Sequence, residues 1–559
     1  MTMSYWSIAE KAIGEISPEL DASETGAFSV LLRNPDAQLL YLVEIHPWND
    51  ASPQSMTSGF PIGSVAIGEF ELDYTGGLET VYISDQGYHT KGGESPAHTS
   101  YLPVTSNPFQ FEASILSGEE FRGSVPSSGA VRILNGDSEY DHLADYYFGG
   151  RRVSVFAGSD GFARAEFAEI FTGFMTQPEF SEDEIIINIS DKSNVLETEF
   201  IQNLYKGEGG LEGGDDIANT PKPLLYGECH NISPVLVDPG NLVYQVHDGA
   251  IEGVTEVYDK GVALTNGGDV ADITVASVSA GQYKTQLSGG YIKLGSSPSG
   301  RVTANAKGDN SGSYVSTTAA IVQRIVTTKM GAKSFTATDL DQGSFNRFDI
   351  EVPATVGIYI DAATDLKQVL DELIVSIQGY WTFNRRGRLT VGVLKSPAGS
   401  SYTITDSDIE EGSLEIRRII PPAWRVSLGY KRAWTLQSED DFAAAAPTDF
   451  KTFAKERYRT VTIESGQVKG RTASQTERTF DSLIISQENA ITEAERIQEI
   501  YGTQRKVIRL DVVNLLFRVF IGDVITLETD KFGLNSKLFL IVGISEDAET
   551  GTTQLELWG

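Results

Sequence analysis

The sequence is poor in cysteine and in histidine. Cys229 is its single cysteine in 559 residues, and there are six histidines. One thiol excludes an intramolecular disulfide framework, and it excludes zinc or iron–sulfur sites built from several cysteines. No two histidines stand at HxxxH or HExxH spacing, so a helical zinc hydrolase site is not encoded. Cys229 and His230 are neighbours and point to opposite faces of a strand, which favours a partly buried small thiol over a nucleophile with its base.

Basic residues are also in short supply. Lys and Arg number 44 against 77 Asp and Glu, which gives a formal charge of 44 − 77 = −33. Such a charge argues against a protein that neutralises nucleic-acid phosphates over its whole surface. Hydrophobic residues make up 40% of the chain and aromatic residues 10%, which excludes global disorder. At roughly 150 residues per domain, the length predicts about three to four domains.

Motifs for catalysis, cofactors and membranes are missing as well. There is no GxSxG elbow and no Walker A sequence, and the glycines at 207–210 fall short of GxGxxG because position 212 is Glu. The alternating acids of 137–141 lack the glycine and the terminal glutamate of a calcium loop. We therefore expect no catalytic, cofactor-binding or metal site. No run approaches the ~18 apolar residues that span a bilayer, and the first 20 residues read as a docked helix, not a secretory signal.

What the sequence does contain is a succession of short alternating runs typical of strands, separated by Gly, Asn, Asp and Pro. Examples are 28–32, 39–45, 65–72, 130–134, 153–156, 170–175, 185–189, 507–513, 524–528, 538–544 and 554–557. Turns about eight to twelve residues apart favour barrels or sandwiches. Helices are expected at 137–148, 311–329, 364–377 and 492–501. Thr364 is the expected N-cap of the third helix and Gly379 its C-cap. The predicted fold class is mainly β with a few helices, in several domains.

We expect five domains along the chain. They are an N-terminal β domain (1–105), a β-barrel with one helix (106–220), an inserted β module (221–312), an α+β domain (313–395) and a C-terminal β-barrel (396–559). Residues 206–216 are a Gly-rich acidic loop at the end of the second of these.

Arginines gather in two places near aromatic residues. They are Arg385, Arg386 and Arg388, and then Arg417 and Arg418. A nucleic-acid groove combines the same residue types. The sequence WTFNRRGRLTVGVL, however, predicts a hairpin with its turn at 384–387 and its arginines exposed there. In so acidic a chain we expect these arginines to pair with carboxylates of a neighbouring subunit.

The order of the pieces resembles a known family. Residues 129–158 (GAVRILNGDSEYDHLADYYFGGRRVSVFAG) are followed by FTG at 171–173, by PLLYG at 223–227 and by VYDKG at 257–261, and then come the amphipathic helix, the arginine hairpin and a β terminus. This succession resembles the tail-tip baseplate hub proteins of long non-contractile-tailed phages and gene transfer agents. The block from 80 to 265 carries the most specific part of the resemblance, and its motifs are architectural, not catalytic.

The resemblance implies a non-enzymatic virion protein at the distal end of the tail, made in the host cytoplasm. Hub proteins of this kind form threefold rings in which two tail-tube-like barrels per subunit mimic the sixfold tube above. The implied partners are two further copies of the chain, a distal tail or tail-tube protein, the tape-measure C-terminus and a central fiber or spike. Genomic DNA would pass through the ring at ejection without stable binding, along walls whose carboxylates repel phosphate.

Two other classes of function remain open from the sequence. One is a tail-associated glycan-binding protein or depolymerase, with Trp424 and Trp434 as aromatic platforms and a pair among the 77 acids as its catalytic carboxylates. The other is a non-viral secretion-tip component built on the same domains.

Overall fold

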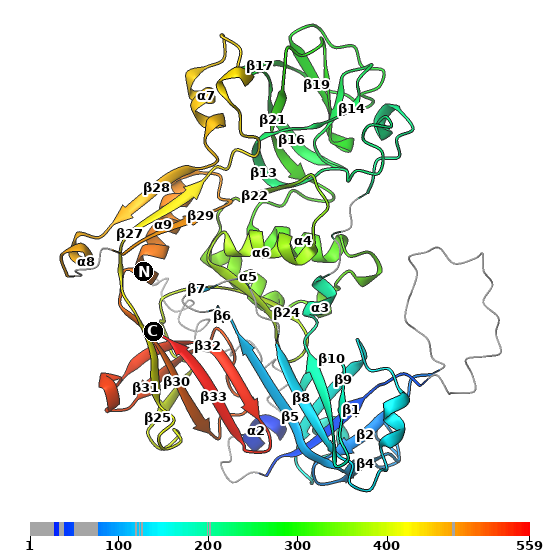
Figure 1. The fold of residues 1–559 in the computed structure, drawn as a ribbon, viewed down its shortest axis with the longest axis vertical. Helices are drawn as coiled ribbons and strands as arrows, with labels where there is room; N and C mark the ends of the chain where they lie inside the picture. The colour runs from blue at the N-terminus through cyan, green and yellow to red at the C-terminus, as the bar shows by residue number, and fades with distance from the viewer. Residues whose placement is uncertain are drawn as a thin grey trace, which may run out of the picture.

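The computed structural model describes residues 27–32, 38–49, 77–117, 120–121, 123, 127–197, 200, 203–471 and 476–559. The fold is mainly β with a few helices, as the sequence predicts. Figure 1 shows a large sheet at one end of the molecule, a layer of helices in the middle and a smaller β region at the other end. The run at 65–72 and the N-terminal helix expected within residues 1–20 lie outside the described residues.

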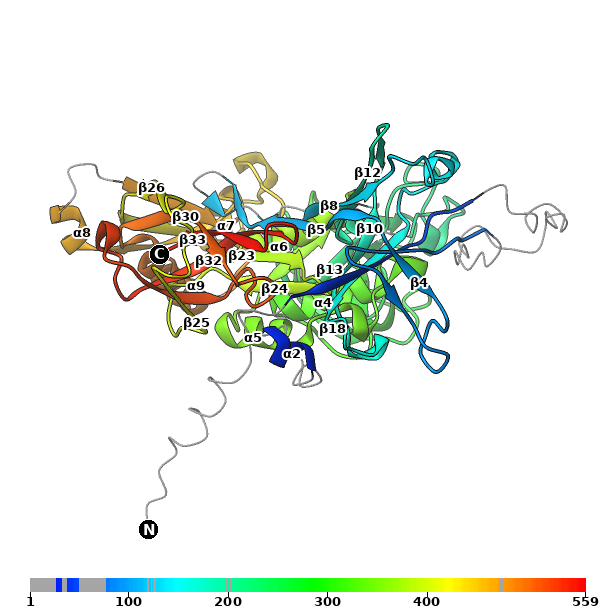
Figure 2. The same cartoon turned by 90° about the horizontal axis from the view of Figure 1, so that it is seen from below.

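A 16-stranded sheet forms the large end of the molecule and spreads across its width (Figure 2). Its main path is β26 (Glu415–Ile420), β30 (Arg505–Val513), β33 (Thr552–Trp558), β32 (Lys537–Asp547), β5 (Thr105–Ser114), β8 (Ser128–Leu134), β12 (Glu184–Ser190), β10 (Ala168–Met175), β9 (Arg152–Gly158), β1 (Leu40–Ile45), β2 (Val81–Ser84), β4 (Ser100–Pro103) and β3 (Tyr88–His89). Strand β31 (Val524–Glu528) pairs with β32 and with β25 (Tyr402–Thr405), and β11 (Glu179–Phe180) pairs with β12. A separate two-stranded pair joins β6 (Leu116–Ser117) to β7 (Glu120–Phe121).

The prediction of closed β-barrels is wrong for the described residues. A barrel in the C-terminal region would need β25 to pair with β26, yet β25 pairs only with β31 and β26 only with β30. The chain between them runs past β30 and contacts it through the bridge from Ile409 to Val512. The spacing of turns in the sequence indicates how often the chain reverses direction. It does not indicate whether the first and last strands pair and close the sheet into a barrel.

The core beneath this sheet draws on both halves of the chain. The ring of Phe109 lies 5.6 Å from that of Phe171 and 5.9 Å from that of Phe517, between centroids. All three side chains are buried. Ring pairs at such distances stabilise by about 0.5–1.5 kcal/mol beyond the burial of their area. The N-terminal and C-terminal strands are therefore held together by packing as well as by the sheet.

A layer of helices covers the middle of the molecule. It consists of α4 (Thr318–Thr328), α5 (Gln342–Glu351) and α6 (Leu366–Val375), with the hairpin of β23 (Gly379–Phe383) and β24 (Leu389–Val393). The helix expected at 364–377 is confirmed, but its predicted caps are wrong. Asp365 and Ser376 flank the helix, and Gly379 instead begins β23 while Gln378 takes the positive φ of the turn. The helix expected at 311–329 begins only at Thr318.

The smaller β region contains two five-stranded sheets, and all of their strands except β22 belong to residues 224–309, which we call the β-module. The first runs β17 (Val262–Ala263), β16 (Ile251–Asp259), β21 (Val302–Asp309), β13 (Leu224–Ile232) and β22 (Gly357–Ile360). The second runs β14 (Val235–Asp238), β15 (Val243–Gln245), β20 (Tyr291–Leu294), β19 (Gln282–Gln286) and β18 (Thr265–Asp269). One apolar cluster with Val257, Tyr283 and Ala304 fills the space between them.

A three-stranded sheet stands at the side of the helical layer. Strand β27 (Ala423–Tyr430) lies between β28 (Arg459–Glu464), which is antiparallel to it, and β29 (Thr476–Asp481), which is parallel to it. Helix α9 (Gln487–Tyr501) packs against one face of this sheet. It confirms the predicted helix at 492–501 and begins five residues earlier, where Ser486 caps it by accepting from the Asn489 amide. Helices α7 (Thr448–Lys455) and α8 (Gly466–Arg471) lie in the connections.

Two short elements differ from their predictions. The run at 28–32 belongs to a helix, α2 (Ala27–Leu32), because a short apolar run fits a buried helix as well as a strand. The helix expected at 137–148 is a 3₁₀ helix of only five residues, Asp141–Asp145, and α3 (Ser193–Leu196) has four residues. The acidic loop at 206–216 contains another 3₁₀ turn, Gly210–Glu212, whose Glu212 pairs with Lys222 at 2.9 Å.

Candidate functional site

The arginine hairpin does not expose all of its arginines, which corrects the prediction. Arg385 is 5% exposed, and its guanidinium donates two hydrogen bonds to Glu546, Nε to Oε2 at 3.0 Å and Nη2 to Oε1 at 2.9 Å. Nη2 also donates to the Val519 carbonyl at 2.7 Å. Burial raises the pKa of Glu546, while Arg385 and the Phe517 amide lower it. Arg385 thus fixes the hairpin to strand β32 within one chain.

The other two hairpin arginines lie nearer the surface. Arg386 and Arg388 are both half-buried, and their backbone amides donate to the side chain of Asn384 at 3.2 and 3.0 Å. Gly387 has a φ of +64°, in the left-handed region that the four-residue turn requires. The predicted turn at 384–387 is therefore confirmed, and the role of these two arginines at a subunit interface stays a prediction.

The second arginine pair lies on the edge strand β26, beside a hollow of about 210 Å³. Arg417 is exposed and pairs with Glu415 at 3.0 Å, whereas Arg418 is half-buried. The hollow is lined by two basic residues, Arg417 and Arg509, and by two acidic ones, Glu112 and Glu556. Burial raises the pKa of Glu556, and the nearby arginines lower it. Gly543 lines the hollow, and a Cβ at this position would lie only 3.0 Å from that of Glu556.

The hollow belongs to a polar face of the large sheet. Register places Glu415, Arg509, Glu556 and Gly543 side by side across β26, β30, β33 and β32. The next row joins Asp511, Gln554, Ser545 and Glu112 across β30, β33, β32 and β5. The carboxylates of this face are Glu112, Glu184, Glu415, Asp511, Asp547 and Glu556, against Arg132, Arg417, Arg418 and Arg509. We call it the acidic sheet face.

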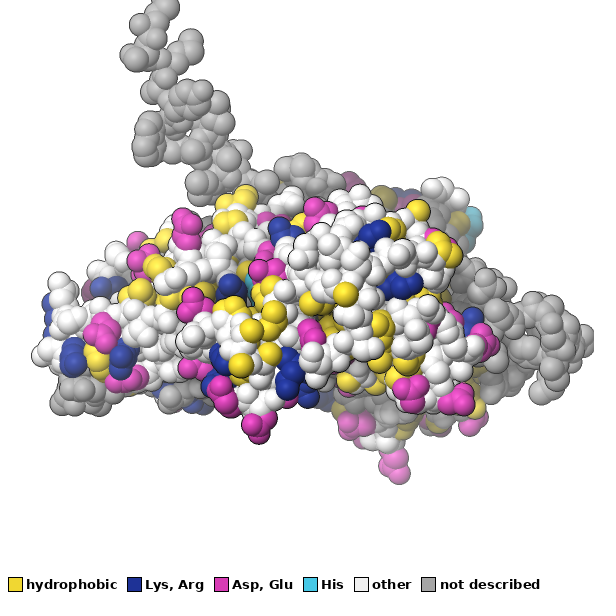
Figure 3. All heavy atoms as spheres, turned by 90° about the horizontal axis from the view of Figure 1, so that it is seen from above, with side chains coloured by type: hydrophobic (Ala, Val, Ile, Leu, Met, Phe, Trp, Pro, Cys, Tyr) yellow, Lys and Arg dark blue, Asp and Glu magenta, His cyan; other side chains and the backbone are white. Residues whose placement is uncertain are grey.

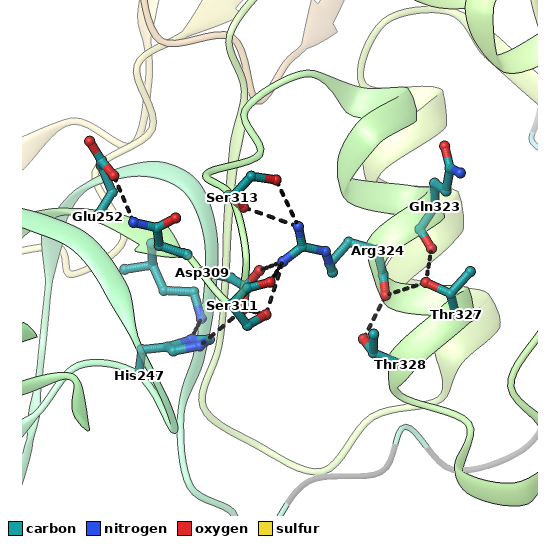
Figure 4. A network of polar contacts seen from close by, with 11 residues as sticks. His247, Glu252, Asp309, Ser311, Ser313, Gln323, Arg324, Thr327 and Thr328 are labelled. Atoms are coloured by element: carbon teal, nitrogen blue, oxygen red, sulfur yellow. Dashed lines mark hydrogen bonds and ion pairs between the residues drawn. The ribbon is translucent and has the colours of Figure 1, made fainter. Parts of the chain in front are cut away.

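A polar network joins the β-module to helix α4 (Figure 4). The guanidinium of Arg324 contacts Asp309 at the end of β21 and donates to the Ser311 and Ser313 carbonyls at 2.9 and 3.0 Å. His247 is buried 3.8 Å from Asp309, and its Nδ1 accepts from the Leu225 amide at 2.9 Å. Burial lowers the pKa of His247 to about 4, so the ring is neutral at pH 7.

A second joint ties the β-module to the segment that follows β27. The Trp434 and Thr435 amides donate to the carbonyls of His230 and Asn231 at 3.1 and 2.8 Å, and Asn231 Nδ2 donates back to the Thr435 carbonyl at 2.6 Å. Farther along, α7 packs Phe450 on Tyr258 of β16 with ring centroids 4.2 Å apart. The β-module is therefore held at two separated places.

The remaining candidates from the sequence are not brought together. Cys229 is fully buried, more than expected, and burial raises the pKa of its thiol. His230 lies 3.2 Å from Glu228. In the described ranges, no group of three or more His, Cys, Asp or Glu side chains is placed to hold a metal ion. No helix in that part of the chain has the length and apolar character needed to cross a membrane.

The aromatic platforms of the glycan-binding alternative are covered. Trp424 is 5% exposed, and the Lys469 ammonium lies 3.8 Å from its ring centroid. The Arg432 guanidinium lies 3.9 Å from the ring of Trp434, which also packs on Tyr359. A sugar-binding platform needs an open ring face, and neither tryptophan offers a clear one.

Comparisons with known proteins give structural similarities at low identity. No family model matches the chain, and no curated protein matches it. A tail protein from Neisseria meningitidis MC58 is 11% identical, with a TM-score of 0.35 over 81% of this chain and 91% of that one. The 43 kDa tail protein of prophage MuSo2 from Shewanella oneidensis is 12% identical, with a TM-score of 0.34 over 83% and 96%. A chain of a native gene transfer agent particle is 13% identical, with a TM-score of 0.35 over 61% and 84%.

Proposed function

We propose that this chain is a structural protein of a phage-like tail tip. Three copies form a ring that joins a sixfold tail tube to a central fiber or spike, and DNA passes through the ring at ejection. The proposal follows from the order of motifs along the chain, and one feature of the fold carries it. Strand β32 pairs with β5 from Gly543 opposite Ser114 to Asp547 opposite Gln110.

That pairing sets two segments side by side in one sheet, 106–220 and 396–559, the two expected to resemble tube subunits. A threefold ring meets a sixfold tube only if each copy offers two comparable units to it. The packing of Phe109 against Phe517 holds these two segments together, and the ion pair of Arg385 with Glu546 fixes the β23–β24 hairpin to the second of them. Two units joined in this way suit a protein that adapts one ring symmetry to another. An enzyme would instead need a set of catalytic side chains brought together in one site.

The acidic sheet face suits a wall past which DNA moves. Six carboxylates against four arginines leave an excess of negative charge along β5, β8, β12, β26, β30, β32 and β33. Exposed charges act on DNA over about a Debye length, ~8 Å at physiological salt. By contrast, Figure 3 shows acidic, basic and hydrophobic side chains mixed over the face seen from above, where the β-module and α7 lie.

The proposed partners follow from this place at the distal end of the tail. They are two further copies of the chain, the tail-tube or distal tail protein, the tape-measure C-terminus and the central fiber or spike. The proposed interface arginines are Arg386, Arg388, Arg417 and Arg418. Each of them has at least part of its surface exposed to solvent: Arg417 is exposed and the other three are half-buried. Arg385 is left out because Glu546 of its own chain already holds it.

Cryo-electron microscopy of tails, with mass photometry of the purified chain, tests the proposal. We expect three copies in a ring below the tube. A sixfold ring of this chain, or its absence from purified particles, would contradict the proposal. Binding of double-stranded DNA by the purified chain should be negligible at physiological salt. A micromolar, salt-sensitive complex would contradict the conduit.

A further inference from the structure

The outer edge of strand β28 is open and regular. The four central residues, Thr460 to Ile463, are all β-branched and uncharged, which favours an extended strand. Six consecutive residues pair with β27 without a register shift, from Glu464 opposite Arg425 to Arg459 opposite Tyr430. Figure 1 shows β28 as an outer strand of the three-stranded sheet, and no strand of the described residues pairs with its outer edge.

The hydrogen-bond phase of this pair shows which backbone groups are free. The Ser465 amide donates to the Trp424 carbonyl at 2.7 Å, which makes 465 and 424 a hydrogen-bonded pair. Such pairs alternate with non-hydrogen-bonded ones in an antiparallel ladder. Thr462 and Ser427 are then a non-hydrogen-bonded pair, whose side chains approach closely, and their hydroxyl oxygens are indeed 3.1 Å apart. The amides and carbonyls of Thr460, Thr462 and Glu464 consequently point away from β27.

Within the described residues, nothing bonds these outward backbone groups. Proteins protect open edges with short strands, bulges, prolines and charges. Other edges of this chain carry such features. Strand β26 has a register shift and two arginines, and Pro421 and Pro422 follow it. Strand β3 is only two residues long, and three of the six residues of β29 are charged. Strand β28 has none of these over its four central residues.

We propose that β28 accepts an extended strand from a different protein of the same particle, which adds to the sheet as a fourth strand. That the partner belongs to the same particle rests on the proposed function. The pairing would be made by the amides and carbonyls of Thr460, Thr462 and Glu464. Side chains of the incoming strand that lie beside Val461 and Ile463 would be apolar, since those two face α9.

Charge favours a different protein over a second copy. The solvent face of the three-stranded sheet carries Glu464, Glu477 and Asp481, and Arg425 already pairs with the first two. Two copies joined edge to edge through β28 would bring two such faces together, with repulsion between like charges. The incoming strand is therefore expected to place hydroxyl or basic side chains on this face, opposite Thr462 and Glu464.

Hydrogen exchange of the free chain and of intact particles tests the proposal directly. The amides of Thr462 and Glu464 should exchange quickly in the free chain and at least tenfold more slowly in particles. Equal exchange in particles that contain the chain would overturn the inference and leave the proposed function standing. Absence of the chain from the particles would instead overturn the proposed function.

A pair of variants separates the backbone from the side chain. Thr462→Pro removes an outward amide without removing a bond to β27, whereas Thr462→Val keeps the amide, and both lose the bond to Ser427. With equal melting temperatures, Thr462→Pro should enter particles at less than a tenth of the wild-type level and Thr462→Val at the wild-type level. Equal incorporation would overturn the proposal. Self-association of the purified wild-type chain, lost in Thr462→Pro, would overturn the assignment to a different protein.

Discussion

Arg385 and Glu546 form a two-bond ion pair in the interior, 161 positions apart in the chain, with both side chains almost fully buried. Glu546 also accepts from the Phe517 amide at 2.8 Å, and Arg385 lies beside the rings of Phe517 and Phe520. The pair therefore joins three parts of the fold: the β23–β24 hairpin, strand β32 and the segment before β31. Both ions are shielded from solvent, so each depends on the other.

Arg385→Ala should destabilise the protein by about 3–5 kcal/mol, because it leaves the Glu546 carboxylate buried without its counter-ion. Calorimetric melting of the purified chain measures the loss. Arg417→Ala, at an arginine that is 45% exposed, is the matched control and should cost less than about 0.5 kcal/mol. The double variant Arg385→Met with Glu546→Leu should recover most of the stability, since it removes both charges. A double variant as unstable as Arg385→Ala would contradict this account.

Asp523→Asn should stabilise the protein at neutral pH. Burial raises the pKa of Asp523 from 3.8 to about 6, against lowering by the Phe520 amide and by Arg385 and Arg347. The folded chain holds this proton more tightly than the unfolded chain, so stability falls as pH rises from about 4 to 6 and then stays level. Replacing the carboxylate with an amide should raise the free energy of unfolding by up to about 3 kcal/mol above pH 6 and change it little at pH 4.

Melting temperatures from pH 4 to 8 check the Asp523 prediction. The exposed Asp440→Asn is the control, and it should leave the pH profile of the wild type unchanged. An Asp523→Asn profile parallel to that of the wild type over the whole range would show that the carboxylate does not carry the effect.

His247 should make the joint between the β-module and α4 weaker in acid. Its pKa is lowered from 6.5 to about 4 by burial, while Asp309 and Asp248 raise it and Lys329 lowers it. The unfolded chain binds the proton first, so stability is lost as pH falls from about 6.5 to 4, by up to about 3 kcal/mol. Protonation would also place a second donor against the Leu225 amide, whose bond Nδ1 accepts.

Hydrogen exchange of β13 and β21 between pH 7 and pH 4 measures this loss, after correction for the intrinsic rate. His247→Gln can still accept from Leu225 and has no proton to gain, so it should remove most of the pH dependence. His89→Gln, at an exposed histidine, should keep it. An identical pH dependence in His247→Gln would place the sensitivity in other groups.

Local pattern predicted the hairpin at 381–393 and the amphipathic α6, because both depend on neighbours in sequence. It missed the fate of Arg385, since the partner Glu546 lies in a strand that the hairpin meets only after folding. It missed the open sheet for the same reason: pairing of β5 with β32 joins residues more than 400 positions apart. The acidic sheet face was also out of reach, because composition counts carboxylates without placing them on a common surface.

Reversing charge on the acidic sheet face should slow DNA release if this face lines the channel. Glu112 is exposed on β5 and Glu415 on β26, and replacing both with lysine changes the charge by four units in each subunit. New ammonium groups would bind passing phosphates through counter-ion release, so the effect should fall as salt rises. We expect the ejection rate of triggered particles at low salt to fall to roughly half of the wild-type rate or less, measured by fluorescence of released DNA.

The control is the double variant Asp440→Lys with Glu439→Lys, beside α7. It adds the same charge at exposed positions away from this face and should eject at the wild-type rate. Equal rates for the two double variants would exclude this face as the channel wall.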